Sequence, residues 1–244
     1  MAYTATATNG FEFKYNKAGF PANSILYEGT SGTTYTKGQL AYLTAGSMLA
    51  VATTSLISTV GTPLVGVVAA TVTCSTKSTE RKVPVYDNPL NVYEVSFEGH
   101  VDSTATAGAA NTITPTSGVF STAANTYAGS LIYLYEGPGK GDVRSIASHT
   151  AANPTVITIN GEWSATPTTA TKMVILSDLS SGDSTHAGIN VGQRKRCDDT
   201  AKKVSALRQT GTDGYLNIVG VNPEKLTCDV MISLVDGILG GAAT

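Results

Sequence analysis

The feature that most constrains this chain is a series of short apolar runs, rich in β-branched and aromatic residues, each bounded by glycine, proline or asparagine. Such runs are typical of β-strands, because a helix needs a longer apolar stripe with a period of 3.6 residues. In the run 91–99, Tyr93 and Val95 alternate with polar neighbours, and the run 228–234 shows the same alternation. Alternation with period two indicates half-buried antiparallel strands. The predicted fold class is therefore mainly β.

Three segments stand apart from the first series of runs. Residues 1–20 are Thr/Ala-rich and then aromatic, without a helical stripe, and are predicted to form an extended N-terminal arm. Residues 102–128 are poor in charge and in large apolar groups, which predicts a loop or a loosely attached meander. Residues 129–180 hold four strong β-runs separated by turn residues, so we expect an antiparallel β-meander module of their own.

The remaining segments, 21–101 and 181–244, are predicted to form one β-domain into which the module is inserted. They contain the only helix that the sequence predicts, a short one over Thr200–Gln209. Aspartates lie near its start and Arg208 lies near its end, as the helix dipole favours.

Composition limits the classes of function. Of the 244 residues, 14% are charged, against about 25% in ordinary soluble domains. So few charges predict that partner protein covers part of the surface. A net charge of −2 argues against binding to nucleic acid. The apolar stretches are too short to span a membrane, and the N-terminus does not resemble a secretory signal, so we expect synthesis in a cytoplasm.

The sequence predicts no catalytic residue, cofactor or metal site. The string EGPGKGDVR at 136–144 lacks the Walker A spacing and the helix that should follow it, and is predicted to be a glycine-rich hairpin turn. In this interpretation, Arg144 is a partly exposed strand residue. The three histidines, His100, His149 and His186, are isolated beside turns and are predicted to be solvated. The three cysteines lie at long, irregular spacing and are predicted to be structural thiols.

Two features could contact partners. The first is a cluster of basic residues, which is predicted to face solvent or a partner's acidic surface. It comprises Arg194, Lys195, Arg196, Lys202 and Lys203. Trp163 is the only tryptophan, and it could stack on a sugar if the chain were a carbohydrate-binding module.

Residues 25–98 contain the runs ILYEGTSGTTYTKGQLAYL, VGTPLVGVVAA and VPVYDNPLNVYEVSFEG, and residues 189–234 end in GYLNIVGVNPEKLTCDVMISL. This layout of strands and turns resembles the head decoration, or cement, proteins of tailed bacteriophages. Residues 131–176 are similar to a β-module that recurs in phage virion proteins. The resemblance implies a small β-barrel or β-tulip domain that carries an inserted module.

The resemblance also implies a function. It predicts a noncatalytic protein on the exterior of a phage capsid that binds the major capsid protein, bridges its subunits and stabilises the shell, as a trimer. The aromatic residues of the arm are predicted to anchor it to the capsid: Phe11, Phe13, Tyr15 and Phe20. The alternatives are another virion structural protein, such as a head fibre or tail tube, and a carbohydrate-binding β-module.

Overall fold

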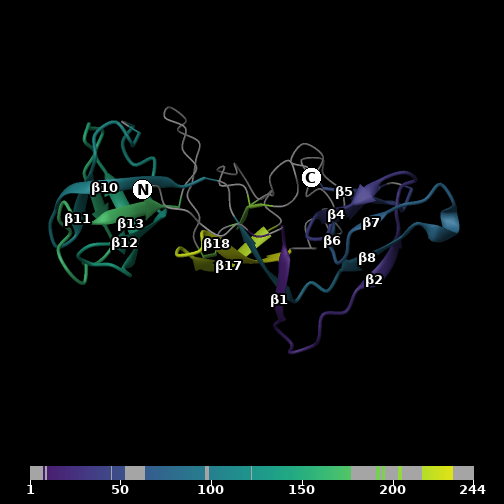
Figure 1. The fold of residues 1–244 in the computed structure, drawn as a ribbon. Helices are drawn as coiled ribbons and strands as arrows, with labels where there is room; N and C mark the ends of the chain where they lie inside the picture. Colours follow the sequence, from purple (N-terminus) through teal and green to yellow (C-terminus); the bar gives the residue numbers. More distant parts are fainter. Residues whose placement is uncertain are drawn as a thin grey trace, which may run out of the picture.

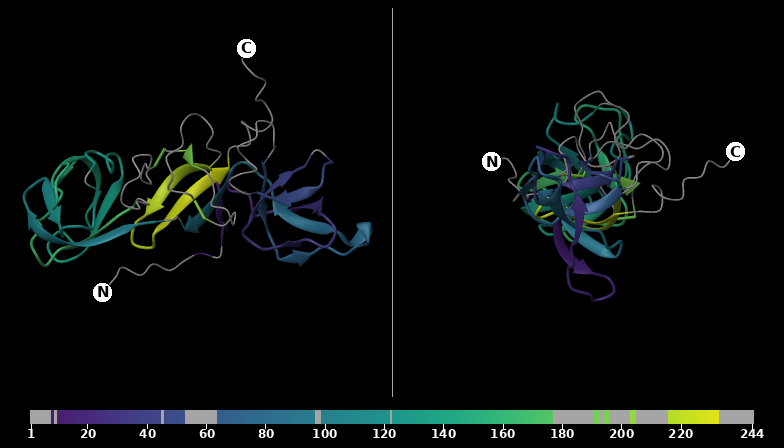
Figure 2. Two further views of the ribbon diagram at one scale, coloured as in Figure 1. Left: turned by 90° about the horizontal axis from the view of Figure 1, so that it is seen from above. Right: turned by 90° about the vertical axis from the view of Figure 1, so that its right-hand side faces the viewer.

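The chain forms an elongated, mainly β structure in which three β-units follow one another in a row (Figures 1 and 2). A closed barrel lies at one end, a five-stranded sheet lies in the middle, and a second five-stranded sheet lies at the other end. The computed structural model describes residues 8, 10–44, 46–52, 64–96, 99–121, 123–176, 191–192, 194–195, 203–204 and 216–232.

The end sheet is antiparallel and is built from the first series of predicted strands. Its strands, in spatial order, are β2 (Ile25–Glu28), β8 (Lys82–Tyr86), β6 (Leu64–Val68), β4 (Leu40–Leu43) and β5 (Leu49–Val51). A short ribbon of β3 (Thr34–Tyr35) and β7 (Val72–Thr73) accompanies it, together with a 3-10 turn, η1 (Ser78–Glu80).

The central sheet joins the beginning of the chain to its last described strands. Its order is β1 (Glu12–Asn16), β9 (Asn91–Ser96), β18 (Thr227–Ile232), β17 (Leu216–Asn222) and β16 (Arg194–Lys195). The predicted alternation is confirmed here, because Tyr93 and Val95 of β9 pair with Val230 and Cys228 of β18 and all four side chains are buried on one face. Residues 12–16 of the predicted arm therefore form an edge strand of the chain's own sheet.

The barrel is antiparallel and closed. Its strands, in spatial order, are β10 (Val101–Gly108), β11 (Thr112–Pro115), β14 (Ile157–Ile159), β13 (Val143–His149), β12 (Leu131–Glu136) and β15 (Lys172–Ile175). The prediction that 102–128 form a loop or a loosely attached meander is wrong, since β10 and β11 lie in this stretch and β10 pairs with β15 to close the barrel. The small side chains of β10 suit the interior, where Ala105 packs among isoleucines and Met173.

Two strands are shared between the barrel and the central sheet. In β12, Ile132 and Leu134 point into the barrel, whereas Leu131, Tyr133 and Tyr135 pack against the core of the central sheet. In β15, Met173 and Ile175 point inward, and Val174 packs outward in the same way. Strands buried on both faces need apolar residues at successive positions, which explains the unbroken runs LIYLY and MVI.

The end sheet joins the central core in the same way, through strands that are buried on both faces. In β4 and β6, Leu40, Leu64 and Val67 pack against the central sheet, while Ala41 and Val68 face the core of the end sheet. One apolar core therefore connects all three β-units.

The described residues contain no α-helix. Most of the predicted helix over Thr200–Gln209 lies outside the described residues. Of its two described residues, Lys203 lies in a bend, and Val204 makes a β-bridge in which its amide donates to the Ser96 carbonyl at 3.0 Å.

Gly66 offers a test of the packing between β6 and β8. A Cβ atom at this position would collide with the backbone carbonyl of Tyr86 in β8. We expect Gly66→Ala to lower the free energy of unfolding by about 2 kcal/mol or more, because strand backbone must shift to make room. Gly46 is the matched control, since its nearest neighbour to an added Cβ is 4.0 Å away. Urea unfolding of both variants measures the difference, and equal stabilities would contradict this packing.

Candidate functional site

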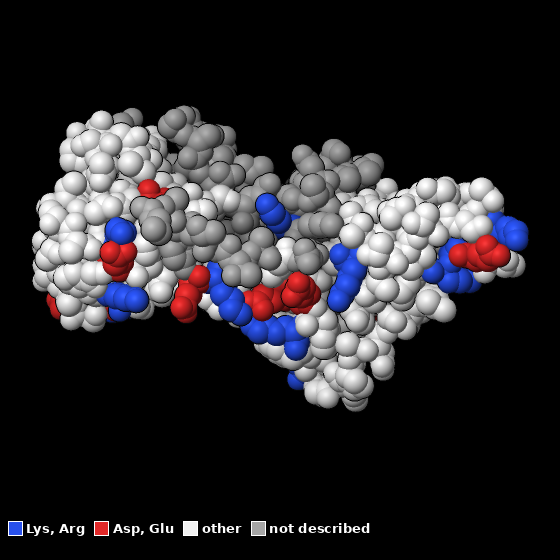
Figure 3. Space-filling view, in the orientation of Figure 1, with Lys and Arg blue, Asp and Glu red and all other residues white. Residues whose placement is uncertain are grey.

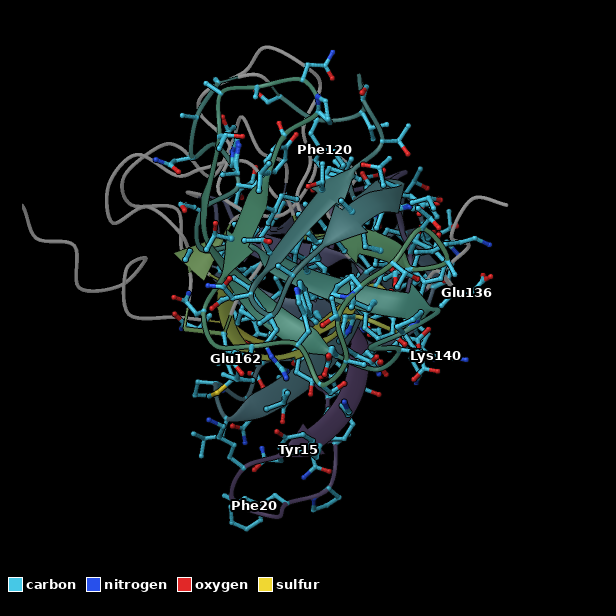
Figure 4. The ribbon with its side chains drawn as sticks, turned by 90° about the vertical axis from the view of Figure 1, so that its left-hand side faces the viewer. Tyr15, Phe20, Phe120, Glu136, Lys140 and Glu162 are labelled. Atoms are coloured by element: carbon cyan, nitrogen blue, oxygen red, sulfur yellow. The ribbon has the colours of Figure 1, made fainter. Side chains whose placement is uncertain are left out.

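The clearest candidate site is a group of exposed apolar side chains on and beside the connection between β1 and β2, which we call the tip. The described residues include seven exposed large hydrophobic side chains. Four of them lie on β1, β2 or the connection between them, and a fifth, Leu90, lies beside it, where its carbonyl accepts the Lys17 amide. The five are Tyr15, Phe20, Ile25, Leu26 and Leu90. In Figure 4, Tyr15 and Phe20 lie at one extremity of the molecule, on the side opposite Phe120 of the barrel.

A buried polar network fixes the base of the tip. The Asn16 side-chain amide donates to the Asn91 Oδ1 at 2.8 Å, and the Asn91 amide donates to the Tyr93 hydroxyl at 3.2 Å. Asn16 Oδ1 in turn accepts the Ala18 amide at 2.8 Å. Buried amides are costly unless they are hydrogen-bonded, so this network holds the chain in one path where it leaves β1. The Lys17 amide also donates to the Leu90 carbonyl at 3.0 Å, which ties the connection to the start of β9.

The four aromatic residues predicted to anchor a capsid have different environments. Phe11 is buried in the central core, and its amide donates to the Gly38 carbonyl at 2.9 Å, so its side chain is not available to a partner. Phe13 is partly buried and its ring contacts those of Tyr86 and Tyr93. Tyr15 and Phe20 are 44% and 62% exposed. Their role as anchors stays a prediction.

The proposed glycan contact is not available on the surface. Trp163 is buried against the barrel core, and its indole N–H donates to the Thr112 carbonyl at 3.2 Å. A ring buried in this way cannot stack on a sugar, so the sequence-based suggestion is wrong for this residue.

The predicted basic patch is only partly described. The backbones of Arg194 and Lys195 form β16, and Lys203 is exposed. The other two members, Arg196 and Lys202, lie outside the described residues, so the patch stays a prediction.

Charged side chains gather on the outer face of the central sheet, where blue and red atoms cross the middle of Figure 3. Glu12, Glu94 and Asp229 lie opposite one another on β1, β9 and β18. Lys14 donates to both Asp229 oxygens at 2.8 and 2.9 Å, and this hydrogen bond raises the pKa of Lys14. The Lys225 ammonium lies 3.6 Å from the Glu94 carboxylate. The carboxylates of Asp229 and Glu94 are thus engaged by lysines of this chain. No group of side chains in the described ranges is suited to hold a metal ion.

The glycine-rich turn after β12 is a hairpin turn to β13, as predicted, and Arg144 is a partly exposed strand residue. Asp142 accepts the Ser164 amide at 2.7 Å and lies 3.2 Å from the Arg144 guanidinium. The Arg144 Nε donates to the Glu162 carbonyl at 2.9 Å. These charges hold two loops of the barrel together.

One histidine differs from the prediction that all three are solvated. His149 is buried against the ring of Tyr127, its Nε2 accepts the Tyr127 amide at 3.1 Å, and its Nδ1 lies 3.2 Å from the Thr150 carbonyl. Because a carbonyl can only accept, Nδ1 carries the hydrogen and the ring is neutral. Burial lowers the pKa of His149. The sequence gives no signal for the burial of His149, because a histidine at the end of a β-run is as compatible with an exposed ring as with a buried one.

In the part of the chain that the structure describes, no helix is long and apolar enough to cross a membrane. Comparisons with protein families, with curated proteins and with solved structures found no significant match to this chain.

The different burial of two phenylalanines leads to a prediction. Phe11→Ala should lower the free energy of unfolding by about 3–5 kcal/mol, because it leaves a cavity in the core shared by the β-units. Phe20→Ala should change it by about 0.5 kcal/mol or less, since Phe20 is exposed. Chemical unfolding of the two variants measures both values. A large loss of stability in Phe20→Ala would mean that the tip is part of the core.

The buried, neutral His149 should make stability depend on pH. Its pKa is lower in the folded chain than the ordinary value near 6.5, so the unfolded chain binds more protons in that range. Stability should therefore be full above about pH 6.5 and fall as the pH decreases below it, by at most about 1.4 kcal/mol per pH unit.

The matched variant is His149→Gln, whose side-chain oxygen can accept the Tyr127 amide without titrating. The pH dependence of its unfolding free energy between pH 7 and pH 5, measured beside that of the native chain, isolates the histidine. Parallel curves for the two proteins would show that His149 does not contribute.

Proposed function

We propose that this chain is a noncatalytic decoration protein that binds the outer surface of a bacteriophage head and bridges major capsid protein subunits. The observation that carries the proposal is the tip, whose five exposed apolar side chains lie on and beside the β1–β2 connection, with Tyr15 and Phe20 at one extremity of the molecule. Exposed apolar clusters of this kind mark sites of contact with other proteins. The sequence resemblance to head decoration proteins supports the choice of partner.

The shape and chemistry of the chain fit an adhesive role. An elongated molecule can contact subunits that are separated on a shell, and Figure 1 shows three β-units in a row. Weak contacts repeated over a lattice become strong through their number. The homotrimer expected from the resemblance belongs to this proposal, because three joined copies would multiply such contacts.

Two alternative functions remain to be compared with the proposal. The structure weakens one of them, and the number of copies in a virion tests the other. The carbohydrate-binding alternative relied on Trp163, which is buried. A head-fibre or tail-tube protein differs from a decoration protein in abundance, since decoration of a shell needs hundreds of copies in each particle. Counting the chain in purified virions separates these possibilities.

The proposal is tested with heads that lack the chain, from the phage that encodes it. Purified chain should sediment with these heads and raise their resistance to heat. Phe20→Ser should weaken binding about tenfold or more, because burying a large apolar side chain stabilises a contact by about 1.5–3 kcal/mol.

The matched control is Val119→Ser, which changes an exposed apolar residue between β11 and β12, away from the tip. It should bind like the native chain. If the native chain leaves the heads unbound and their heat resistance unchanged, the proposed function is wrong.

A further inference from the structure

The segment between β11 and β12 lies against one end of the barrel, and its middle is bonded to the last residue of β13. We call it the strap, and the structure describes its residues 118–121 and 123–129. The Asn125 amide donates to the His149 carbonyl at 3.2 Å, and the His149 amide donates to the Asn125 Oδ1 at 3.0 Å. The Tyr127 amide donates to the His149 Nε2 at 3.1 Å. Three hydrogen bonds of the strap therefore involve one histidine.

The strap covers the barrel core with two aromatic rings. Phe120 and Tyr127 are buried in this core, and their rings meet edge-on with centroids 5.5 Å apart. The Tyr127 ring in turn lies 5.0 Å from the imidazole of His149. The other described residues of the strap are small or polar, apart from the exposed Val119. The two rings thus supply most of its apolar contact with the barrel, and Figure 4 shows Phe120 on the side of the barrel away from the tip.

A glycine in a left-handed conformation stands at each end of the strap. Gly118 has a φ of +79° and Gly129 has a φ of +83°. No atom lies within 4 Å of the place where a Cβ would stand at either position. Glycine adopts either sign of φ at little cost, and hinges are residues that absorb large changes in φ and ψ. The strap therefore has a permissive residue at each end and a titratable contact at its middle.

The contact at the middle exists only while His149 is neutral. Its Nδ1–H faces the Thr150 carbonyl, so a second proton can bind only at Nε2. Nε2 would then be a donor that faces the N–H of Tyr127, and this hydrogen bond would be lost. The Tyr127 ring attracts a cation weakly, but it replaces neither the lost bond nor the hydration that a buried charge gives up. Burial accordingly lowers the pKa of His149.

The described elements that contact His149 offer no charge to stabilise an imidazolium. These elements are the strap, the turn after β13, and β14, where Ile157 pairs with His149. They lie within 103–135 and 145–161, and neither stretch contains aspartate, glutamate, lysine or arginine. The titratable side chain that faces the imidazole is Tyr127, and burial raises the pKa of its phenol, which keeps it neutral. Protonation of His149 is therefore paid for by opening of the strap.

We propose that the strap is an acid-operated cover, which protonation of His149 Nε2 releases from the end of the barrel. The strap turns about Gly118 and Gly129 and carries its two aromatic rings away from the core. The barrel stays closed, because its six strands pair with one another without the strap. The released rings and the uncovered core form an apolar surface that is present in acid and absent at neutral pH. This release is independent of the partner proposed for the tip.

Amide hydrogen exchange of the full chain, followed by NMR, tests the release. The protection factors of the Asn125 and Tyr127 amides should fall by up to about tenfold for each pH unit below about 6.5. They should be about tenfold or more below that of the Leu134 amide, which donates to the Asp142 carbonyl in the barrel. About 1 M urea should lower the protection of Leu134 and leave that of Tyr127 unchanged, because a local opening exposes little surface.

Two variants separate titration from the strength of attachment. His149→Gln keeps an acceptor for the Tyr127 amide but does not titrate, so its strap should show no dependence on pH. Tyr127→Phe loses the hydroxyl that accepts the Ser121 amide at 3.0 Å and keeps the amide that bonds to His149. Its strap should be less protected at every pH and keep the native pH dependence. The uncharged dye Nile red should bind more strongly at pH 5 than at pH 7 to the native chain, and equally at both to His149→Gln.

Each outcome decides the proposal. A fall in protection of the strap amides in acid that is absent in His149→Gln supports it. The same fall in both proteins would overturn it. Equal protection and equal urea dependence of Tyr127 and Leu134 would mean that the strap opens only when the barrel unfolds, and would overturn it as well. The urea comparison needs only the native chain, so it decides the question even if His149→Gln does not fold.

Discussion

The structure depends on strands that are buried on both faces. β12 and β15 line the barrel with one set of side chains and pack against the central sheet with the other, and β4 and β6 do the same at the end sheet. Each β-unit thus completes the core of its neighbour, and none of the three can shift without exposing apolar surface, at about 25 cal/mol for each Å². This shared burial joins the three small sheets into one continuous row.

The sequence predicted the elements whose two faces differ or whose faces are both apolar. The alternation around Tyr93 and the unbroken run LIYLY each have one simple interpretation, and both strands are present. β10 was missed because its interior positions, such as Ala105, are small. Their size suits a barrel already filled by Trp163, Phe120 and Met173, and complementary packing between distant segments has no local sequence signal.

The candidate site shows that the burial of single residues also cannot be predicted from their local sequence. Phe11 and Phe20 are the same residue type in the same predicted arm, but one packs in the central core and the other is exposed. Nothing within residues 1–20 distinguishes them, because the difference is set by Gly38 and by the neighbouring strands. The sequence could indicate an aromatic, adhesive segment there. Only the structure shows that Ile25, Leu26 and Leu90, outside this segment, are exposed as well.

The buried amide pair at the base of the tip connects the fold to its proposed adhesive role. Asn16 and Asn91 would destabilise the chain if either lost its partner, since a buried unsatisfied amide costs about 1–3 kcal/mol. The pair therefore orders the base of the tip, at Asn16 and Ala18, before any partner arrives. A surface that is already ordered loses less conformational entropy on binding. In the proposed role, a small ordered tip would contribute one weak contact per copy, and such contacts become strong when many copies act together.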